Sequence, residues 1–275
     1  MHSFLRTAHH RQRLVVVAST ILILFGLTAC GTPGATLGTA QSPSAMPLSS
    51  TGTPSTTSII LFNGTGTSAS DVSAVEAILT ANNLGYITKN SSQIEAMSES
   101  QLAGYKLLIV PGGNSITIGN NLTSAATTNI HNAVVNDGMH YLGICAGGFF
   151  GGYSIYNGLN LTSGHWFDFY EEYYDGYHKL AALVSTPTGT PLDQYWQDGP
   201  EFTGWGSIVG KYPDGTPAIV EGASGNGWVI LSGVHPEAPS SWRSGMTFTT
   251  SVATDNAYAG TLILAALNRT TLSHY

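Results

Sequence analysis

Apolar runs and helical periodicities alternate through residues 58–138. Apolar runs that end at turn residues are typical of buried strands, and apolar side chains spaced three to four positions apart are typical of helices. The predicted elements, in order, are a strand at 58–64, a helix opening at 70–71 and closed by Gly85, a strand at 86–88, helical turns at 94–97 and 98–102, a strand at 106–110 and a helix at 125–136. This order predicts parallel strands joined by right-handed crossovers, with both faces of the sheet covered.

Residues 181–275 change character. Short apolar stretches are separated by turn sequences such as Pro213-Asp214-Gly215 and Gly225-Asn226-Gly227, which are typical of hairpins. The predicted elements are strands at 181–184, 206–212, 217–221 and 227–231, and a closing helix at about 258–267. The predicted fold class is α/β, with a mostly parallel central sheet and antiparallel additions in the second half.

The first thirty residues have the pattern of a secretory signal. Three arginines precede a mostly apolar run at 14–27, and Leu27-Thr28-Ala29-Cys30 follows. Small residues before a cysteine at this position resemble a bacterial lipobox, which implies cleavage before Cys30 and lipid on its thiol. We therefore expect residues 1–30 to be a lipoprotein-type signal peptide and the protein to be extracytoplasmic, anchored to the membrane through Cys30. The alternative is an uncleaved N-terminal anchor, which leaves the domain on the same side.

Residues 31–57 consist mainly of Gly, Thr, Ser, Pro and Ala, with few large apolar residues and no charge. Such a segment buries too little surface to offset the entropy of ordering. We expect it to be a flexible tether. The remaining residues, 58–275, are enough for one well-packed domain.

The domain is acidic. The chain has 9 basic and 16 acidic residues, and three of the basic ones precede the apolar run, so 6 remain and the net charge is about −10. An acidic surface argues against nucleic acid as a partner. Of the 2 cysteines, Cys145 has no disulfide partner within the chain if Cys30 carries lipid. An unpaired thiol in an exported protein is a candidate reactive group.

Cys145 lies in a sequence typical of a nucleophile elbow. An apolar run from Met139 ends in Gly143-Ile144-Cys145-Ala146-Gly147, the pattern of a strand that turns sharply into a helix beneath a reactive side chain. Glycines leave room for the crowded backbone of such a turn. A helix N-terminus behind the sulfur favours the thiolate, which is the nucleophile. The alternative is a small buried cysteine in a core strand.

Two further segments fall at predicted strand ends. Pro111-Gly112-Gly113 follows one strand and His235-Pro236-Glu237 follows another, so both are expected in the crevice at the carboxyl ends of the strands, beside Cys145. A histidine beside a thiol can deprotonate it, and a carboxylate can orient the ring. Two residues apart on an extended segment, His235 and Glu237 point the same way. His140 and His165 are weaker candidates for the base.

These three motifs, in this order, resemble a class I glutamine amidotransferase-like domain. More closely, residues 141–148 and 195–200 are similar to the biotin–protein ligase N-terminal domain family. The resemblance spans nearly all of residues 58–267 and implies a flavodoxin-like three-layer sandwich. Because it concerns an N-terminal domain alone, it does not imply ligation.

The resemblance also implies roles for individual residues. Cys145 would be the nucleophile, His235 the general base and acid, and Glu237 the orienting group of a Cys–His–Glu triad. Backbone N–H groups of Gly113 and Ala146 would form the oxyanion hole. Substrate contacts would come from Gly112, Asp198 and Gly199, although Gln-Asp-Gly-Pro at 197–200 departs from the Asn-Gly-Gly type of the nearer family.

We expect a cysteine hydrolase of the amidase type, acting through a thioester acyl-enzyme on a small-molecule or peptide-like amide. It needs no cofactor and no metal. The alternatives are a tethered binding domain that keeps the pocket without turnover, and a glutamine amidotransferase subunit, which would require the export prediction to be wrong.

Aromatic and acidic residues alternate irregularly over 165–178, matching neither a strand nor a helix. The segment is either a lid that presents aromatic platforms and negative charge to a sugar-like or cationic ligand, or a loop that packs its rings on the domain.

Overall fold

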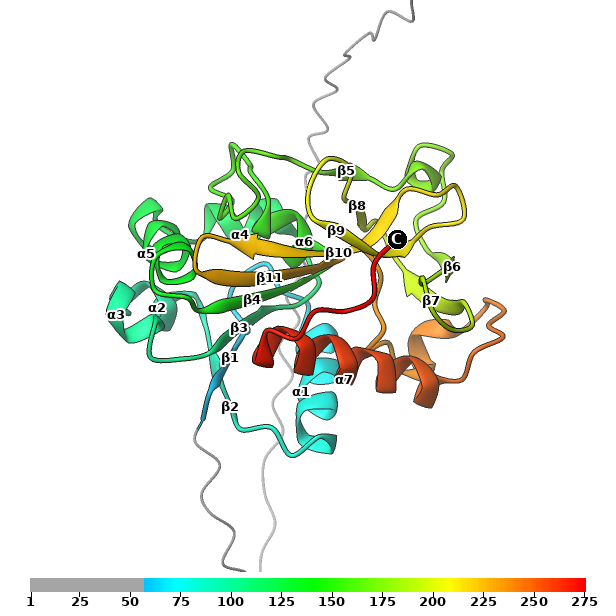
Figure 1. Cartoon of the computed structure of the whole chain (residues 1–275), viewed down its shortest axis with the longest axis horizontal. Helices are drawn as coiled ribbons and strands as arrows, with labels where there is room; N and C mark the ends of the chain where they lie inside the picture. The colour runs from blue at the N-terminus through cyan, green and yellow to red at the C-terminus, as the bar shows by residue number, and fades with distance from the viewer. Residues whose placement is uncertain (1–56) are drawn as a thin grey trace, which may run out of the picture. The chain divides into compact units, whose positions relative to one another are not determined.

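The structure, a computed structural model, describes residues 57–275 (Figure 1). The predicted signal peptide, Cys30 and all but the last residue of the tether lie outside the described residues. No helix within residues 57–275 is long and apolar enough to cross a membrane.

A seven-stranded sheet forms the centre of the domain, in the order β2-β1-β3-β4-β11-β10-β9. Strands β2, β1, β3, β4 and β11 run parallel, and β10 and β9 add antiparallel strands at one edge. The bounds are β1 Ile59–Phe62, β2 Tyr86–Lys89, β3 Leu107–Val110, β4 His140–Ile144, β9 Ser207–Lys211, β10 Pro217–Ser224 and β11 Gly227–Ser232. The predicted α/β class with a mostly parallel sheet and antiparallel additions is confirmed.

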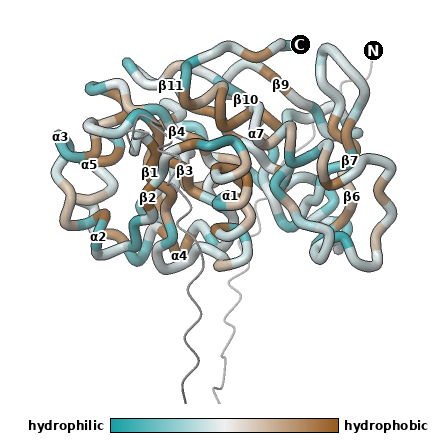
Figure 2. The backbone as a smooth tube through the Cα atoms, turned by 90° about the horizontal axis from the view of Figure 1, so that it is seen from below, coloured by the Kyte–Doolittle hydropathy of each residue, from teal (hydrophilic) through white to brown (hydrophobic). Residues whose placement is uncertain are grey.

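Helices cover both faces of this sheet, with α1 and α7 on one side and α4, α5 and α6 on the other (Figure 1). Their bounds are α1 Ala69–Ala81, α2 Ser91–Glu95, α3 Glu99–Leu102, α4 Ser115–Asn120, α5 Ser124–Val135, α6 Ala146–Gly151 and α7 Val252–Asn268. Alternate side chains of β1 therefore enter different cores: Ile59 and Leu61 belong to the α1/α7 core, and Ile60 and Phe62 to the opposite one. Apolar residues accordingly concentrate along the strands (Figure 2).

Several predicted boundaries differ from the structure. Gly85 does not cap the first helix: α1 ends at Ala81, Asn82 is its C-cap, and Asn83 takes the left-handed conformation with φ 53°. Asparagine adopts this conformation more readily than most side chains, so no glycine is needed. The last helix begins at Val252 rather than 258, because Ser251 caps it and accepts a hydrogen bond from the Thr254 N–H.

Two small two-stranded sheets lie outside the central one. Strands β6 Leu180–Val184 and β7 Leu192–Trp196 form one, and β5 Asp168–Phe169 and β8 Pro200–Glu201 form the other. Of these four strands, only β6 was predicted. The segment at 165–178 is otherwise a loop with a short 3-10 turn, η1 Glu171–Tyr173. It buries Phe167 and Tyr170 but leaves Trp166, Tyr174 and Tyr177 exposed.

Candidate active site

Cys145 occupies the sharp turn between β4 and α6. Its backbone has φ 51° and ψ −107°, a region that non-glycine residues occupy only when the surrounding structure enforces it. The Cys145 N–H donates to the Ser232 carbonyl of the neighbouring β11 at 2.7 Å, which pins the turn to the sheet. The sharp strand-to-helix turn predicted for this residue is therefore present.

The glycines on either side of Cys145 allow this geometry. A Cβ on Gly147 would lie 1.9 Å from the Val110 carbonyl oxygen, and a Cβ on Gly143 would lie 2.3 Å from the Gly147 carbonyl oxygen. Both contacts are with backbone, which cannot swing aside as a side chain can. A side chain at Gly147 would push α6, and Cys145 with it, away from β3, and one at Gly143 would push α6 away from β4.

His235 and Glu237 follow β11 and lie together, as their spacing predicts. The His235 Nδ1 is 2.9 Å from the Glu237 Oε1, and both side chains are almost fully buried. The His235 N–H donates to the Tyr195 carbonyl at 2.8 Å, which ties this segment to β7. The tautomer with a proton on Nδ1 leaves Nε2 for Cys145.

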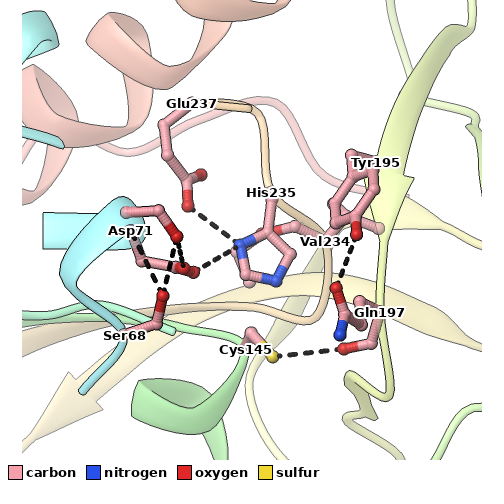
Figure 3. A network of polar contacts seen from close by, with 10 residues as sticks. Ser68, Asp71, Cys145, Tyr195, Gln197, Val234, His235 and Glu237 are labelled. Atoms are coloured by element: carbon pink, nitrogen blue, oxygen red, sulfur yellow. Dashed lines mark hydrogen bonds and ion pairs between the residues drawn. The ribbon is translucent and has the colours of Figure 1, made fainter. Parts of the chain in front are cut away.

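The imidazole of His235 faces the Cys145 sulfur (Figure 3). Burial alone would lower the pKa of His235, but the charges of Cys145 and Glu237, and hydrogen bonds with both, raise this pKa well above its usual value. The Cys145 Sγ also lies 3.5 Å from the Gln197 carbonyl oxygen, so the protonated thiol has a second acceptor. This arrangement allows a proton to pass between sulfur and ring.

A second carboxylate, from Asp71, reaches the same ring nitrogen. The Asp71 Oδ1 lies 3.3 Å from the His235 Nδ1 (Figure 3). By its sequence context Asp71 belongs only to the start of α1, where an acidic residue is ordinary. The one available signal was its place after β1, at the same end of the sheet as Cys145.

A cavity of about 450 Å³ opens over the sulfur. Its lining residues are Ser68, Ser70, Asp71, Gly113, Cys145, Lys179, Tyr195, Gln197, Asp198, His235, Ser241 and Trp242. His178 joins the rim, because its Nδ1 lies 2.9 Å from the Asp198 Oδ1. The aromatic and acidic segment at 165–178 thus ends at the cavity.

The residues predicted to bind substrate or oxyanion divide between the cavity and its supports. Gly113 and Asp198 line the cavity, and Ala146 is the first residue of α6, whose N–H has no partner within the helix. Gly112 and Gly199 are buried and absent from the lining. A Cβ on Gly199 would lie 1.9 Å from the Gly233 carbonyl oxygen, so this glycine serves close backbone packing.

The two other candidate histidines lie away from the sulfur. His140 is in β4 but its Nδ1 is 2.6 Å from the Ala266 carbonyl oxygen of α7, and its pKa is lowered, chiefly by burial. The His165 Nδ1 lies 2.9 Å from the Thr162 carbonyl oxygen. Neither lines the cavity at Cys145.

Asp71, His235 and Glu237 each bring one possible metal-ligand atom within 4.8 Å of the others. The Nδ1 to Oε1 distance of 2.9 Å is that of a hydrogen bond. Two ligands of a tetrahedral zinc ion lie about 3.4 Å apart. We therefore assign the contact between His235 and Glu237 to an N–H···O hydrogen bond.

Comparisons with known proteins agree with this architecture. Residues 57–161 match the family model described as biotin-protein ligase, N terminal. A crystal structure of a glutamine amidotransferase superposes with a TM-score of 0.52 at 19% identity, covering 66% of this chain and 90% of that one. A candidate GMP synthase component from Thermoplasma acidophilum gives 0.50 at 11% identity, covering 77% and 95%. No curated protein matches the sequence.

This domain has the glutamine amidotransferase-like fold. The resemblance to the biotin–protein ligase N-terminal family is also confirmed, over residues 57–161. The family match includes the Pro-Gly-Gly loop and the Cys145 elbow, and it ends before His235 and Glu237. The second half of the glutamine amidotransferase-like domain, which completes the site, therefore rests on the fold and on the contacts described above.

Proposed function

We propose that this protein is an exported cysteine hydrolase that cleaves amide bonds through a thioester acyl-enzyme. The observation that carries the proposal is that Cys145 and His235, from distant parts of the chain, line one open cavity, while Glu237 lies behind the ring with its Oε1 2.9 Å from the His235 Nδ1. A glutamine amidotransferase-like fold agrees with amidohydrolase or amidotransferase chemistry.

The reaction follows from the positions of the side chains. His235 takes the Cys145 proton, and the sulfur attacks the amide carbonyl carbon. The tetrahedral oxyanion is stabilised by the N–H groups of Gly113 and Ala146. The C–N bond breaks, the imidazolium gives its proton to the leaving amine, and a thioester remains on Cys145.

Water resolves the thioester. Neutral His235 removes a proton from the water as it attacks the acyl carbon, the C–S bond breaks, and the ring returns this proton to the sulfur. The products are a carboxylic acid and the free thiol. Glu237 holds the ring with Nε2 toward the reacting atoms throughout.

The charges that line the cavity favour an uncharged or zwitterionic amide as the substrate. It brings two carboxylates, Asp71 and Asp198, and one cation, Lys179, around the sulfur. Tyr195 and Trp242 form an aromatic wall, with ring centroids 5.4 Å apart. A substrate with exposed polar groups on one side and an apolar body on the other fits such a lining.

Alkylation of Cys145 by iodoacetamide, measured from pH 5 to 10, tests the thiol chemistry. A free thiol is about 0.3% ionised at pH 6, so rapid labelling at pH 6 requires help from the imidazolium. We expect His235→Ala to slow labelling at pH 6 by about a hundredfold. His165→Ala, which alters a histidine outside the site, is the matched control and should leave the profile unchanged.

Mass spectrometry after incubation with a panel of small amides tests turnover. We expect an acyl adduct on Cys145 that hydroxylamine removes, as it does from a thioester. A thiol that is labelled no faster than free cysteine, with no adduct from any amide, would support a tethered binding domain instead.

Export and lipid anchoring are tested separately. We expect the full chain to partition with membranes and to incorporate labelled fatty acid, and Cys30→Ala to abolish the labelling. A soluble cytoplasmic protein would favour the amidotransferase subunit, whose ammonia needs a synthetase partner.

A further inference from the structure

Asp71 is the only charged side chain that is buried within residues 57–161. It is the third residue of α1, and its backbone N–H is held by the Ser68 side chain at 3.5 Å. Its carboxylate points toward His235 (Figure 3). Burying a carboxylate is unfavourable unless it is paired, and here its partner is the imidazole.

The Pro-Gly-Gly loop leaves space for this contact. A Cβ on Gly112 would lie 2.0 Å from the Asp71 Oδ1 and 2.7 Å from the His235 Cε1. Any other residue at position 112 would force the carboxylate and the ring apart. The absence of a side chain at Gly112 thus preserves the approach of Asp71 to His235.

The two carboxylates on Nδ1 differ in access. Glu237 is 2% exposed and is not part of the cavity lining, whereas Asp71 is 7% exposed and lines the cavity. Burial raises the pKa of Glu237, its contact with His235 opposes this, and the nearby charge of Asp71 adds to the rise. Glu237 is therefore the partner that is enclosed in the core, and Asp71 is the one that reaches the cavity.

Other charged and titratable groups around the ring come from several elements. Cys145 faces it from the start of α6, and Tyr195 from β7 with centroids 5.7 Å apart. Trp242 packs on it without charge at 5.6 Å. Lys179 and Asp198 lie elsewhere on the cavity wall. Asp71 and Glu237 are thus the two carboxylates in contact with Nδ1 within residues 57–275.

We propose that Asp71 is a positioning residue of the site, a second carboxylate that stabilises the charged form of the His235 ring and keeps the ring aimed at Cys145. The inference rests on the proposed hydrolase and deepens it: Glu237 fixes the ring from within the core, and Asp71 supplies the negative charge from the cavity side. Asp71 acts on substrate through His235 and takes no part in bond making.

The titration of the His235 ring tests this directly. NMR of the full-length protein carrying Cys145→Ala, in which no thiol contributes, reports the ring signal that disappears in His235→Ala. We expect Asp71→Asn to lower the titration midpoint of His235, because an anionic neighbour favours the charged ring. Glu76→Gln, which removes a charge from the same helix away from the site, should leave it unchanged. An unchanged midpoint in Asp71→Asn overturns the proposal, whether or not the protein is an enzyme.

Alkylation of Cys145 gives the second readout. We expect Asp71→Asn to slow labelling at pH 6 by about tenfold and to converge with the wild type near pH 10, where His235 no longer matters. Faster labelling at every pH would mean that Asp71 only repels the thiolate, and would overturn the proposal while leaving the hydrolase intact. If His235→Ala is labelled at the same rate as the wild type at every pH, the proposed hydrolase function is contradicted instead.

Chemical rescue by formate tests the difference in access between the Asp71 and Glu237 carboxylates. Formate should restore labelling at pH 6 in Asp71→Ala, because the deleted side chain opens onto the cavity. Glu237→Ala should not respond, because its site is sealed. Thermal unfolding of each variant shows whether the fold is retained, and Asp71→Asn, which keeps the shape, carries the test if Asp71→Ala does not fold. Rescue of neither variant, or of both equally, contradicts the assigned difference in access.

Discussion

The two halves of the domain are held together differently. In residues 57–161, strands β1 and β3 are wholly apolar, and Asp71 is the one buried charge of this half. Residues 162–275 bury Asp193, Glu221, Arg243 and Asp255 in addition to His235 and Glu237. The first half supplies the nucleophile on a rigid elbow, and the second half supplies the base and most of the cavity wall. Half of the site thus depends on nonpolar packing, and the other half on buried polar pairs.

Those pairs fix segments that have little regular structure. Arg243, at the end of a 3-10 turn that also carries Trp242, contacts Asp255 of α7 and donates to the Thr250 carbonyl at 3.0 Å. Asp193 accepts from the Thr249 N–H at 2.6 Å. Glu221 accepts from the Leu272 N–H at 2.7 Å. Backbone N–H and carbonyl groups in irregular segments lack the hydrogen bonds of a helix or sheet, so buried side chains provide these bonds instead.

Breaking one pair in the second half should have the largest effect on stability. Arg243→Ala leaves the Asp255 carboxylate buried without its cation, and we expect a loss of about 3–5 kcal/mol in the free energy of unfolding. Burial already raises the pKa of Asp255, while Arg243 opposes the rise. In the variant this pKa rises further, so folding takes up a proton and the loss should grow as the pH increases from 5 to 8.

Urea unfolding at both pH values measures this loss. The double variant with Asp255→Asn removes the charge and should recover part of the stability. A loss that is equal at pH 5 and pH 8, with no recovery in the double variant, would show that the pair is not the cause.

Adding a side chain at a tightly packed glycine should lower the free energy of unfolding by about the same amount in both halves. Gly147→Ala places a Cβ 1.9 Å from the Val110 carbonyl oxygen, and Gly199→Ala places one 1.9 Å from the Gly233 carbonyl oxygen. We expect each to cost about 1–3 kcal/mol by overpacking. Gly104→Ala, where the nearest atom would be 3.2 Å away, is the milder control. Only Gly147→Ala should also slow alkylation of Cys145, since it displaces the elbow itself.

Helix caps provide a smaller, matched pair. Thr123 caps α5 in the first half and Ser251 caps α7 in the second, each accepting a hydrogen bond from an N–H three residues on. Thr123→Ala and Ser251→Ala should each cost about 1 kcal/mol. If the halves unfold as one unit, both variants show a single transition in urea. A second transition in either would mean that the halves are separately stable.

Two histidines should give pH dependences of opposite sign. The raised pKa of His235 means that its charge adds stability, fully present below its ordinary pKa of about 6.5 and lost as the pH rises through the folded value. The lowered pKa of His140 means that its protonation costs stability as the pH falls.

Urea unfolding from pH 5 to 9 separates these contributions. His140→Ala should weaken the loss of stability on the acid side. Cys145→Ala, which removes the charge that contributes most to the raised pKa of His235, should weaken the loss on the alkaline side. The same change in slope from both variants would contradict the assignment of opposite signs.

Local sequence determined most of the first half and the two motifs of the site. Strands β1, β3 and β4 follow from continuous apolar runs, and the pairing of His235 with Glu237 follows from a spacing of two residues on extended chain. The elbow at Cys145 follows from the glycines that a tight turn needs. Each of these features depends on neighbours in sequence, so a pattern of a few residues is enough to predict it.

Tertiary structure alone decided which side chains meet around the thiol. Asp71 reaches the His235 Nδ1, the Gln197 carbonyl reaches the Cys145 sulfur, and Trp242 is placed by a 3-10 turn held to α7. Strand β7 and the early start of α7 escaped prediction because buried polar residues, Asp193 and Asp255, interrupt their apolar patterns. Such residues are tolerated only because distant partners satisfy them, and local periodicity carries no information about a distant partner.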